Sequence, residues 1–477
     1  MSKALKSFVL FQIFMGCAST SNAADKRAWL AGDHHIHSEY SVGWDDANPP
    51  RPIVGGDAIY SITFNAGMGR QFGLDWMVAT DHGGPNHSKI NLEMAYPEIL
   101  SAREALPDVL LFVGLELNTP GADHSSIIVP HTFDEAQQLF QYESLFDKRE
   151  NWPLDESRDD ESLMLEAIEY VNNWKEKPVV IAHHPSRSAK ELGEYGETTP
   201  AELRKWNDAA PEVAVGMEGA PGHQAAKFTT HEGKNIYPAW VFSRGAYGMG
   251  YPTMGGFDQM TAKLGGFWDS MLSEGRRWWI TANSDSHIHY TEGGIDFWPG
   301  EYSKTYVFAE KNYDDIIDGI RNGRVFVATG DLVNELYVSV SGVDHQAEIG
   351  GRLTVNKNEK VTIKIRFKDP VSPNAAGNNP SVQRVDLIVG EMSGRHDDLS
   401  TDTSPTTKVV KRFTSWSSED DFQVISYPLN ITRPVYLRVR GSSNKDELEP
   451  AADEPDENPW ADLWFYSNPV FVDLDAG

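Results

Sequence analysis

The sequence predicts two folded parts, an α/β domain followed by an antiparallel β-sandwich, and three observations lead to this prediction. Before residue 330, short apolar runs recur with helical or loop-like stretches between them. After residue 331, the pattern changes to alternating apolar and polar residues. Histidine also divides the chain, because 13 of its 15 His lie at or before His289. A chain of 477 residues has room for two or three domains at about 150 residues each.

Residues 1–23 are typical of a secretory signal peptide. Lys3 and Lys6 supply a basic start, a short apolar stretch covers residues 8–15, and the small residues Ser21 and Ala23 suit a signal peptidase. We therefore expect a periplasmic or secreted protein. Gly16-Cys17 also resembles the end of a lipobox, so a lipid anchor through Cys17 is an alternative.

Composition excludes several classes of function. Cys17 is the single Cys, and cleavage after Ala23 would remove it, which excludes disulfides, Cys-ligated zinc and thiol catalysis. The formal net charge of −28 argues against a nucleic-acid partner, because polyanion binding needs Lys and Arg gathered on one face. No apolar run approaches about 18 residues, so no transmembrane segment is expected in the mature protein.

The predicted α/β domain spans residues 24–330. Seven buried-looking runs indicate the strands of an α/β barrel or of an open α/β sheet, and residues 161–177 have a helical pattern between two of them. Nearly every run ends in His, Asp or Glu. In a parallel barrel the carboxyl ends of the strands meet in one place, so these endings favour an active site there. The runs are "AWLAGDHHIH", "LDWMVATDH", "VLLFVGLE", "PVVIAHH", "VAVGMEG", "WWITANSDSH" and "KTYVFAE".

The predicted β-sandwich spans residues 331–477. Its alternation of period two, bounded by Gly, Pro, Asn and Asp, is typical of antiparallel strands. Only His345 and His396 lie in this part, so we expect it to contribute packing and no metal ligand. The runs are "ELYVSVS", "KVTIKIRFK", "QRVDLIVGE", "TKVVKRFTS", "DFQVISYP", "PVYLRVRG" and "DLWFYSNPVFVDL".

Pairs of metal-type side chains stand at the predicted strand ends. His35 and His37 are two residues apart, so both imidazoles point to one face and one metal ion can bind both. His34 lies between them and is expected to face the other way, as a hydrogen-bonded packing residue. By the same reasoning, only one of His183 and His184 should enter the site. Carboxylates and imidazoles without thiolates suit zinc, manganese or iron.

Five motifs in order, "GDHHIHS", "TDHG", "GLE", "AHHP" and "SDSH", resemble those of the PHP (polymerase and histidinol phosphatase) family of metal-dependent phosphoesterases. The resemblance covers about residues 28–330. The chain is most similar to the branch of carbaryl-hydrolase-like metallohydrolases, which share the segment from Gly323 to Gly330 and a β-rich tail. The resemblance implies a distorted (β/α)7 barrel of PHP type, consistent with the seven runs.

The resemblance also implies a set of metal ligands. Glu116 would bridge two divalent metal ions, and His184 would be the ligand of its pair. Many family members have an Asp or His five or six residues after the H-x-H motif, whereas this chain has Val42 and Gly43, so two ions are expected and a third stays open. The implied ligands are His35, His37, His82, Glu116, His124, His184, Asp285 and His287.

Three residues are candidates for the chemistry itself. Asp285 would accept a proton or orient the nucleophile, and His223, after the fifth run, is a candidate general acid. Arg187 is a candidate to bind a non-bridging phosphate oxygen. Packing or a surface role is the alternative for His223, and a surface ion pair is the alternative for Arg187.

We therefore expect an exported, metal-dependent hydrolase of small phosphoester substrates. Phosphodiesters with apolar ester groups are favoured, because the motif loops offer few cationic groups and residues 237–268 contain many aromatic ones, namely Trp240, Phe242, Tyr247, Tyr251 and Phe257. The first alternative is a carboxylic or carbamate ester hydrolase. The second is an exported binding protein without catalysis.

Overall fold

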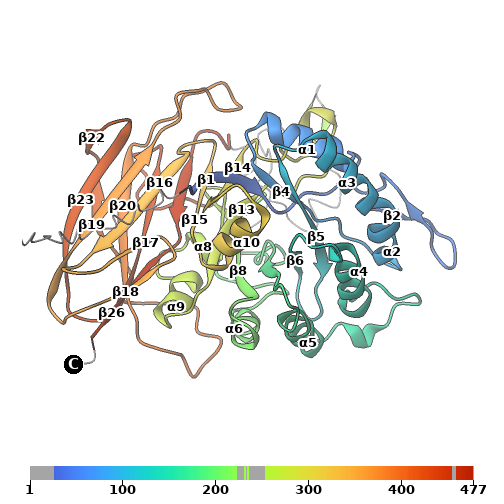
Figure 1. The fold of residues 1–477 in the computed structure, drawn as a ribbon, viewed down its shortest axis with the longest axis horizontal. Helices are drawn as coiled ribbons and strands as arrows, with labels where there is room; N and C mark the ends of the chain where they lie inside the picture. The colour runs from blue at the N-terminus through green and yellow to red at the C-terminus, as the bar shows by residue number, and fades with distance from the viewer. Residues whose placement is uncertain (1–25, 223–229, 232–233, 236–252, 454–457, 476–477) are drawn as a thin grey trace, which may run out of the picture.

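The structure, a computed structural model, describes residues 26–222, 230–231, 234–235, 253–453 and 458–475. Figure 1 shows two parts side by side, one in which helices surround strands and one built almost entirely of strands. Among the described residues, no helix is long and apolar enough to cross a membrane. The expected signal peptide, with Cys17, lies outside the described residues.

All seven runs predicted as strands in the first part are strands, but their sheet is mixed in direction. The order is β13-β8-β7-β6-β5-β4-β1-β14-β15. β6 was not predicted from the sequence, and it runs antiparallel to both β5 and β7. β14 runs antiparallel to β1 and β15. The strands are β1 (Ala28–Asp33), β4 (Trp76–Ala79), β5 (Leu110–Asn118), β6 (His124–Ile128), β7 (Val179–Ala182), β8 (Ala214–Pro221), β13 (Trp279–Asn283), β14 (Ser303–Ala309) and β15 (Val325–Thr329).

The segments that follow β1 and β13 join far-apart strands of this sheet. Ile36 and Ser286 form a single bridge, within which the His37 N–H donates to Ser286 O at 3.0 Å. The Asp285 N–H donates to His35 O, also at 3.0 Å. No ladder joins β13 to β1 or β14 in the described part of the chain, so the seven-stranded barrel stays a prediction. The bridge nevertheless brings two motif segments together.

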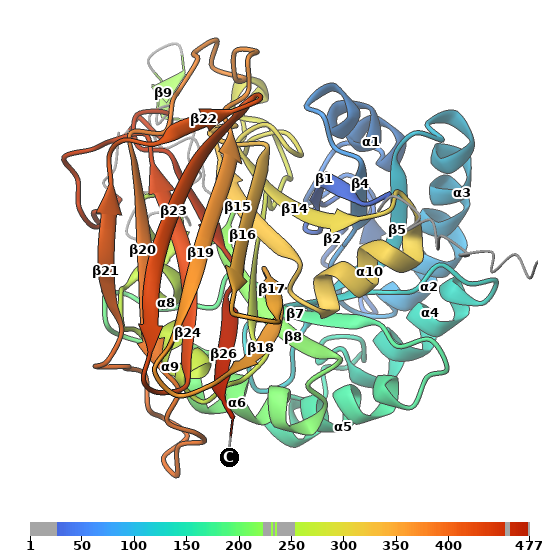
Figure 2. The ribbon, with the colours of Figure 1, turned by 60° about the vertical axis from the view of Figure 1, so that its left-hand side comes forward.

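Helices α3, α4 and α5 lie on the side of the sheet away from the strand-rich part (Figures 1 and 2). In α5 the Asp160 side chain accepts from Ser162 N at the N-cap, and the helix ends at Asn172, short of the predicted end at residue 177. Its buried residues recur at helical spacing and face the core. The helices are α1 (Ile62–Gln71), α2 (His87–Ile90), the π-helix η1 (Asn91–Ala95), α3 (Tyr96–Ala105), α4 (Glu135–Phe146), η2 (Glu156–Arg158), α5 (Glu161–Asn172), α6 (Pro200–Ala209), α8 (Gln259–Ala262), α9 (Phe267–Ser273), η4 (Tyr290–Glu292) and α10 (Tyr313–Arg321).

The second part consists of two sheets that share one apolar core, as the alternation predicts. One sheet has the order β17-β16-β19-β23-β22, and in β16 and β19 inward residues alternate with more exposed ones. Leu336, Ile363 and Phe367 of this sheet pack in the same core cluster as Leu387 and Leu437 of the other. The strands are β16 (Glu335–Ser341), β17 (Gln346–Glu348), β18 (Arg352–Val355), β19 (Glu359–Lys368), β20 (Arg384–Glu391), β21 (Lys408–Phe413), β22 (Ser417–Glu419), β23 (Phe422–Ile431), β24 (Val435–Ser442), β25 (Trp464–Ser467) and β26 (Val470–Leu474).

The two parts share one continuous sheet. β15 pairs antiparallel with β25, so the strand order runs on as β15-β25-β24-β20-β21 across the predicted boundary at residue 330. β24 is buried on both faces, and its Arg438 binds Asp269 of α9 through two bonds of 2.9 Å. Short strand pairs complete the fold: β2 (Gly43–Trp44) with β3 (Pro52–Ile53), β9 (Thr230–His231) with β10 (Lys234–Asn235), and β11 (Thr253–Met254) with β12 (Phe257–Asp258).

Candidate metal centre

Neighbouring strands of the first sheet place the predicted ligands in one connected cluster. His35 and His37 follow β1, and His82 follows β4. Glu116 lies within β5 and His124 begins β6. His184 follows β7, while Asp285 and His287 follow β13. The fold thus brings together predicted ligands that are as many as 252 positions apart in the sequence.

Acceptor atoms surround Nε2 of His35. This nitrogen lies 3.0 Å from Asp285 Oδ1, 3.1 Å from Glu116 Oε1 and 3.0 Å from His37 Nε2. The other ring nitrogen, Nδ1, lies 2.7 Å from Glu218 Oε1. Although burial opposes it, the imidazoles of His183 and His35 lower the pKa of Glu218 to about 2, so the carboxylate is ionised and can only accept. His35 Nδ1 therefore carries the proton, and its Nε2 faces other acceptors.

His37 is in the same situation. Its Nε2 lies 3.2 Å from Asp285 Oδ1 and 3.4 Å from Glu116 Oε2. Burial and the neighbouring His287 lower the pKa of His37 well below its ordinary value, so this ring is neutral. Against the effect of burial, Asp285 and Glu116 raise the pKa of His35 well above its ordinary value. The four side chains thus require a positive charge between them, and a divalent cation can contact all four whereas one proton cannot.

Glu116 lies at the middle of a second group of imidazoles. Its Oε1 is 3.0 Å from His124 Nδ1, from His183 Nδ1 and from His184 Nε2. The buried Nδ1 of His124 makes no hydrogen bond within the described residues despite that approach. A buried nitrogen without a hydrogen bond, 3.0 Å from a carboxylate, fits a shared metal ligand sphere better than a packing role.

A third group forms the outer edge of the centre and contains an acid that the motifs do not predict. The His37 and His287 rings stack at 3.9 Å, and His82 Nε2 lies 3.1 Å from Asp57 Oδ2. The same oxygen is 3.5 Å from His287 Nε2. Against the effect of burial, His287 and His82 hold the pKa of Asp57 well below its ordinary value. Asp57 thus supplies a carboxylate to this third group, whereas Val42 and Gly43, at the positions where many family members have Asp or His, supply none.

The expectation that only one of His183 and His184 enters the site is wrong. Both rings approach Glu116 Oε1, because His184 has a positive φ of 22° and does not continue the strand pleat. Asp285 also has a positive φ, 49°. Such backbone conformations are uncommon for residues other than Gly. They occur mainly at functional sites, where the surrounding contacts hold the backbone in place.

Two further buried residues support the cluster from behind. Glu218 of β8 accepts hydrogen bonds from His35 Nδ1 and from the Asn283 side chain. It stands at the end of the fifth run, but it is not among the predicted ligands. His34 binds Thr281 Oγ1 at 2.8 Å, as predicted for a packing residue. Burial lowers the pKa of His34 to about 3, so it is neutral.

The remaining candidate residues have different outcomes. Arg187 lies at the centre, with its Nη1 donating to His184 Nε2 at 3.1 Å. His223 and the aromatic residues 240, 242, 247 and 251 lie outside the described residues. Phe257 is fully buried against Tyr466, with ring centroids 4.3 Å apart, so it packs in the core and does not line an opening.

The centre is open along one edge among the described residues. The side chains of His35, His37 and Glu116 are at most 2% exposed. By contrast His82 and His287 are each 25% exposed and Asp57 is 38% exposed. Asp285, at 15%, lies between the buried and the open groups. Among the described residues, solvent therefore contacts the centre at Asp57, His82 and His287.

Neither a protein-family model nor a curated protein matches the chain. Among solved structures, the chain is similar to a two-domain protein from Bacteroides vulgatus that contains a predicted PHP-like metal-dependent phosphoesterase. The two are 14% identical, with a TM-score of 0.36, over 94% of this chain and 96% of that one. A TM-score of 0.36 is too low to establish a shared fold, so the geometry of the centre carries the functional proposal.

Proposed function

We propose that this chain is an exported, PHP-type, metal-dependent phosphoesterase. The observation that carries the proposal is the convergence of His35 Nε2, His37 Nε2, Asp285 and Glu116, which a single imidazolium proton cannot contact all at once. Imidazoles and carboxylates suit zinc, manganese or iron. Glu116 and the imidazoles around it would hold two divalent ions, and His37, His82, His287 and Asp57 would provide donors for a third.

The residues present allow ester hydrolysis by water. Divalent ions bound at such a centre lower the pKa of water to roughly 7 and polarise the ester oxygen. Against burial, His35 and His37 hold the pKa of Asp285 well below its ordinary value, so its carboxylate is ionised, and at 15% exposure it could also accept a hydrogen bond from water. Asp285 would orient the attacking water, and the buried imidazoles and Glu116 would hold their positions without rearranging.

Charge near the centre favours phosphodiesters over phosphomonoesters. Among the described residues, Arg187 is the Lys or Arg side chain that contacts a predicted ligand, His184. Asp57 and Asp123 add negative charge next to His82 and His124. Lys89 instead lines a separate open hollow of about 530 Å³ with Trp152 and Glu150. A monoester dianion would meet one guanidinium among several carboxylates, whereas a diester carries a single negative charge. Asp57 supplies a carboxylate beside His82, which Val42 and Gly43 do not, so a donor for a third ion is present.

The alternatives predict different measurements. A carboxylic or carbamate ester hydrolase would use the same centre. Phe257, a described member of the aromatic set, is buried in the core, so it supports apolar ester groups neither for a phosphodiester nor for this alternative. A binding protein without catalysis would hold metal and show no turnover. Export and a small-molecule ester as the partner belong to the proposal, and a lipid anchor through Cys17 is the alternative to cleavage after Ala23. Mass spectrometry of the mature N-terminus tests export and distinguishes the two N-termini.

The test combines metal analysis with an activity panel on the purified protein. We expect at least two divalent ions per chain and turnover of p-nitrophenyl esters of phosphate, and we expect His37→Ala to lose both metal and turnover while its circular dichroism spectrum is unchanged. Normal metal content and turnover in His37→Ala would refute the centre. Turnover restricted to naphthyl carbamates or carboxylates would select the first alternative, and metal without any turnover would select the second.

A further inference from the structure

The hydroxyl of Ser41 stands between two of the proposed ligands and a buried carboxylate. Ser41 Oγ lies 2.8 Å from His37 Nδ1 and 3.2 Å from Asp81 Oδ1. It also accepts from the backbone N–H of His82 at 3.1 Å. Ser41 is fully buried and Asp81 is 2% exposed, so no water competes for these bonds. We infer that Ser41, held by Asp81, is a positioning residue that sets the tautomer of His37 and the location of His82.

The hydrogen-bonding capacity of a hydroxyl leads to this inference. A serine hydroxyl has one proton to donate and two lone pairs to accept with. Asp81 is an acceptor for Ser38 and receives the Ser41 proton, while the His82 N–H uses one Ser41 lone pair. One lone pair remains, and His37 Nδ1 can use it only as an N–H donor. His37 Nε2 is then left with its lone pair directed at Glu116 and Asp285.

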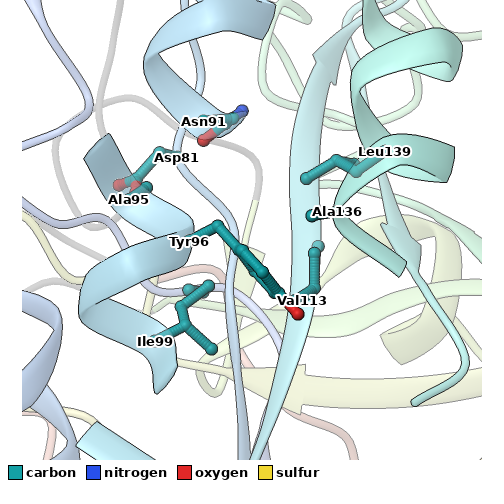
Figure 3. A pocket seen from close by; sticks show the side chains of 10 residues that line it. Asp81, Asn91, Ala95, Tyr96, Ile99, Val113, Ala136 and Leu139 are labelled. Carbon is teal, nitrogen blue, oxygen red and sulfur yellow. The ribbon is translucent and has the colours of Figure 1, made fainter. Parts of the chain in front are cut away.

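Hydrogen bonds fix the position of the Asp81 carboxylate next to Ser41. Its two oxygens receive Ser38 N, Ser38 Oγ and Ser41 Oγ, all from the segment that follows the H-x-H motif. On its other side Asp81 lines a cavity of about 10 Å³ among Tyr96, Ile99 and Val113 (Figure 3). Its hydrogen-bonding groups therefore turn toward the centre and away from the helix layer.

Loss of the hydroxyl would release the imidazole. The inference rests on the proposed function, because it concerns how His37 presents Nε2 to a metal ion. Without Ser41 Oγ, His37 can move its proton to Nε2 and donate to Asp285 or Glu116, which occupies the position that a cation would take. Residues that orient a metal-binding imidazole in this way are worth 10–100-fold in metal affinity.

The experiment measures cobalt(II) affinity of the metal-free full-length protein by competition with a chelator, together with its visible absorption spectrum and its melting temperature. We expect Ser41→Ala to weaken cobalt binding about 10–100-fold and to alter the spectrum, with a melting temperature of the metal-free form within about 3 °C of wild type. Ser41→Thr, which keeps the hydroxyl, should restore most of the affinity. Ser126→Ala is the matched control, because its buried hydroxyl faces His34 at 3.5 Å and not a proposed ligand.

The outcomes separate this inference from the function on which it rests. Cobalt binding by wild type with equal affinity in Ser41→Ala would overturn the positioning role and leave the metal centre standing. An equal loss in Ser41→Ala and Ser41→Thr, with a large drop in melting temperature, would assign Ser41 to folding and also overturn the inference. No cobalt binding by wild type would overturn the inference and the proposed metal centre together.

Discussion

At the scale of single residues, Glu116 carries the largest share of the proposed chemistry. Five imidazoles approach its carboxylate, so its negative charge, more than its size, should hold the cations. We expect Glu116→Gln, which preserves the volume, to reduce zinc or manganese affinity by at least about 100-fold, because even partners of ligands cost 10–100-fold. Metal content after dialysis checks this. Glu143→Gln is the control, since Glu143 is equally buried and binds His87 at 2.6 Å outside the centre.

Arg187 should decide which phosphoester is preferred. With one guanidinium at the cluster, a diester should be hydrolysed at least tenfold better in kcat/KM than a monoester, which corresponds to about 1.4 kcal/mol of transition-state discrimination. We expect Arg187→Gln to lower kcat/KM for p-nitrophenyl methyl phosphate, because a diester still needs its charge balanced. A higher kcat/KM for p-nitrophenyl phosphate than for the diester in wild type would contradict the charge argument.

Sequence reasoning found residues whose position follows from strand periodicity and missed those that depend on a turn. The pair His35/His37 was predictable from its spacing of two, whereas the positive φ of Asp285 means that strand periodicity does not explain how Asp285 and His287 meet. Asp57 was not, because it reaches the centre from a loop 20 positions after His37. The entry of His183 beside His184 follows from a positive φ that no spacing rule contains.

At the scale of elements, the apolar runs located the strands but not all of their directions. Each run predicted as a strand is one, because burial on both faces leaves a continuous apolar signature. β6 has the sequence HSSII, in which three of the five residues are polar, so it lacks that signature. The antiparallel direction of β6 depends on how the chain connects β5, β6 and β7, and the pattern of apolar runs contains no information on these connections.

The contact between α2 and the segment that follows α4 should depend on pH. Burial and Glu143 raise the pKa of Glu150 to about 7, and its carboxylate accepts from Ser88. A raised carboxyl pKa favours the protonated folded state, so this group costs stability as pH rises above about 4.5, and the cost is complete above about 7. We expect Glu150→Gln to raise the melting temperature by a few degrees at pH 8 and by little at pH 4.5.

The measurement is a series of thermal unfolding curves from pH 4.5 to 8 with a chelator present, so that metal binding does not contribute. Glu166→Gln on the exposed side of α5 is the control and should show no such trend. A shift for Glu150→Gln that is the same at every pH would show that charge is not its cause.

At the scale of the whole molecule, the two parts are held together by a buried ion pair. Arg438 of β24 and Asp269 of α9 are both 0% exposed and joined by two bonds. Removing one partner leaves a buried charge alone, so we expect Arg438→Met to lower the free energy of unfolding by about 3 kcal/mol. Denaturant unfolding checks this value.

Arg352→Met provides the comparison for that ion pair. Arg352 binds Asp473 through two contacts of 3.0 Å, but the two side chains are 44% and 32% exposed. An exposed pair contributes about 1 kcal/mol or less, so the two variants should differ clearly. Equal effects would mean that the α9–β24 contact does not couple the parts.

The sheet shared across residue 330 also bears on how the protein exchanges its amide hydrogens. Val327 and Ala328 of β15 pair with Tyr466 and Phe465 of β25, and all four residues are at most 2% exposed. The amides that join these two strands cannot be exposed to solvent in one strand without breaking the ladder of the other. In deuterium oxide, peptides from β15 and β25 should therefore take up label at one common rate, the rate of global opening, although 134 residues separate their ends in the sequence.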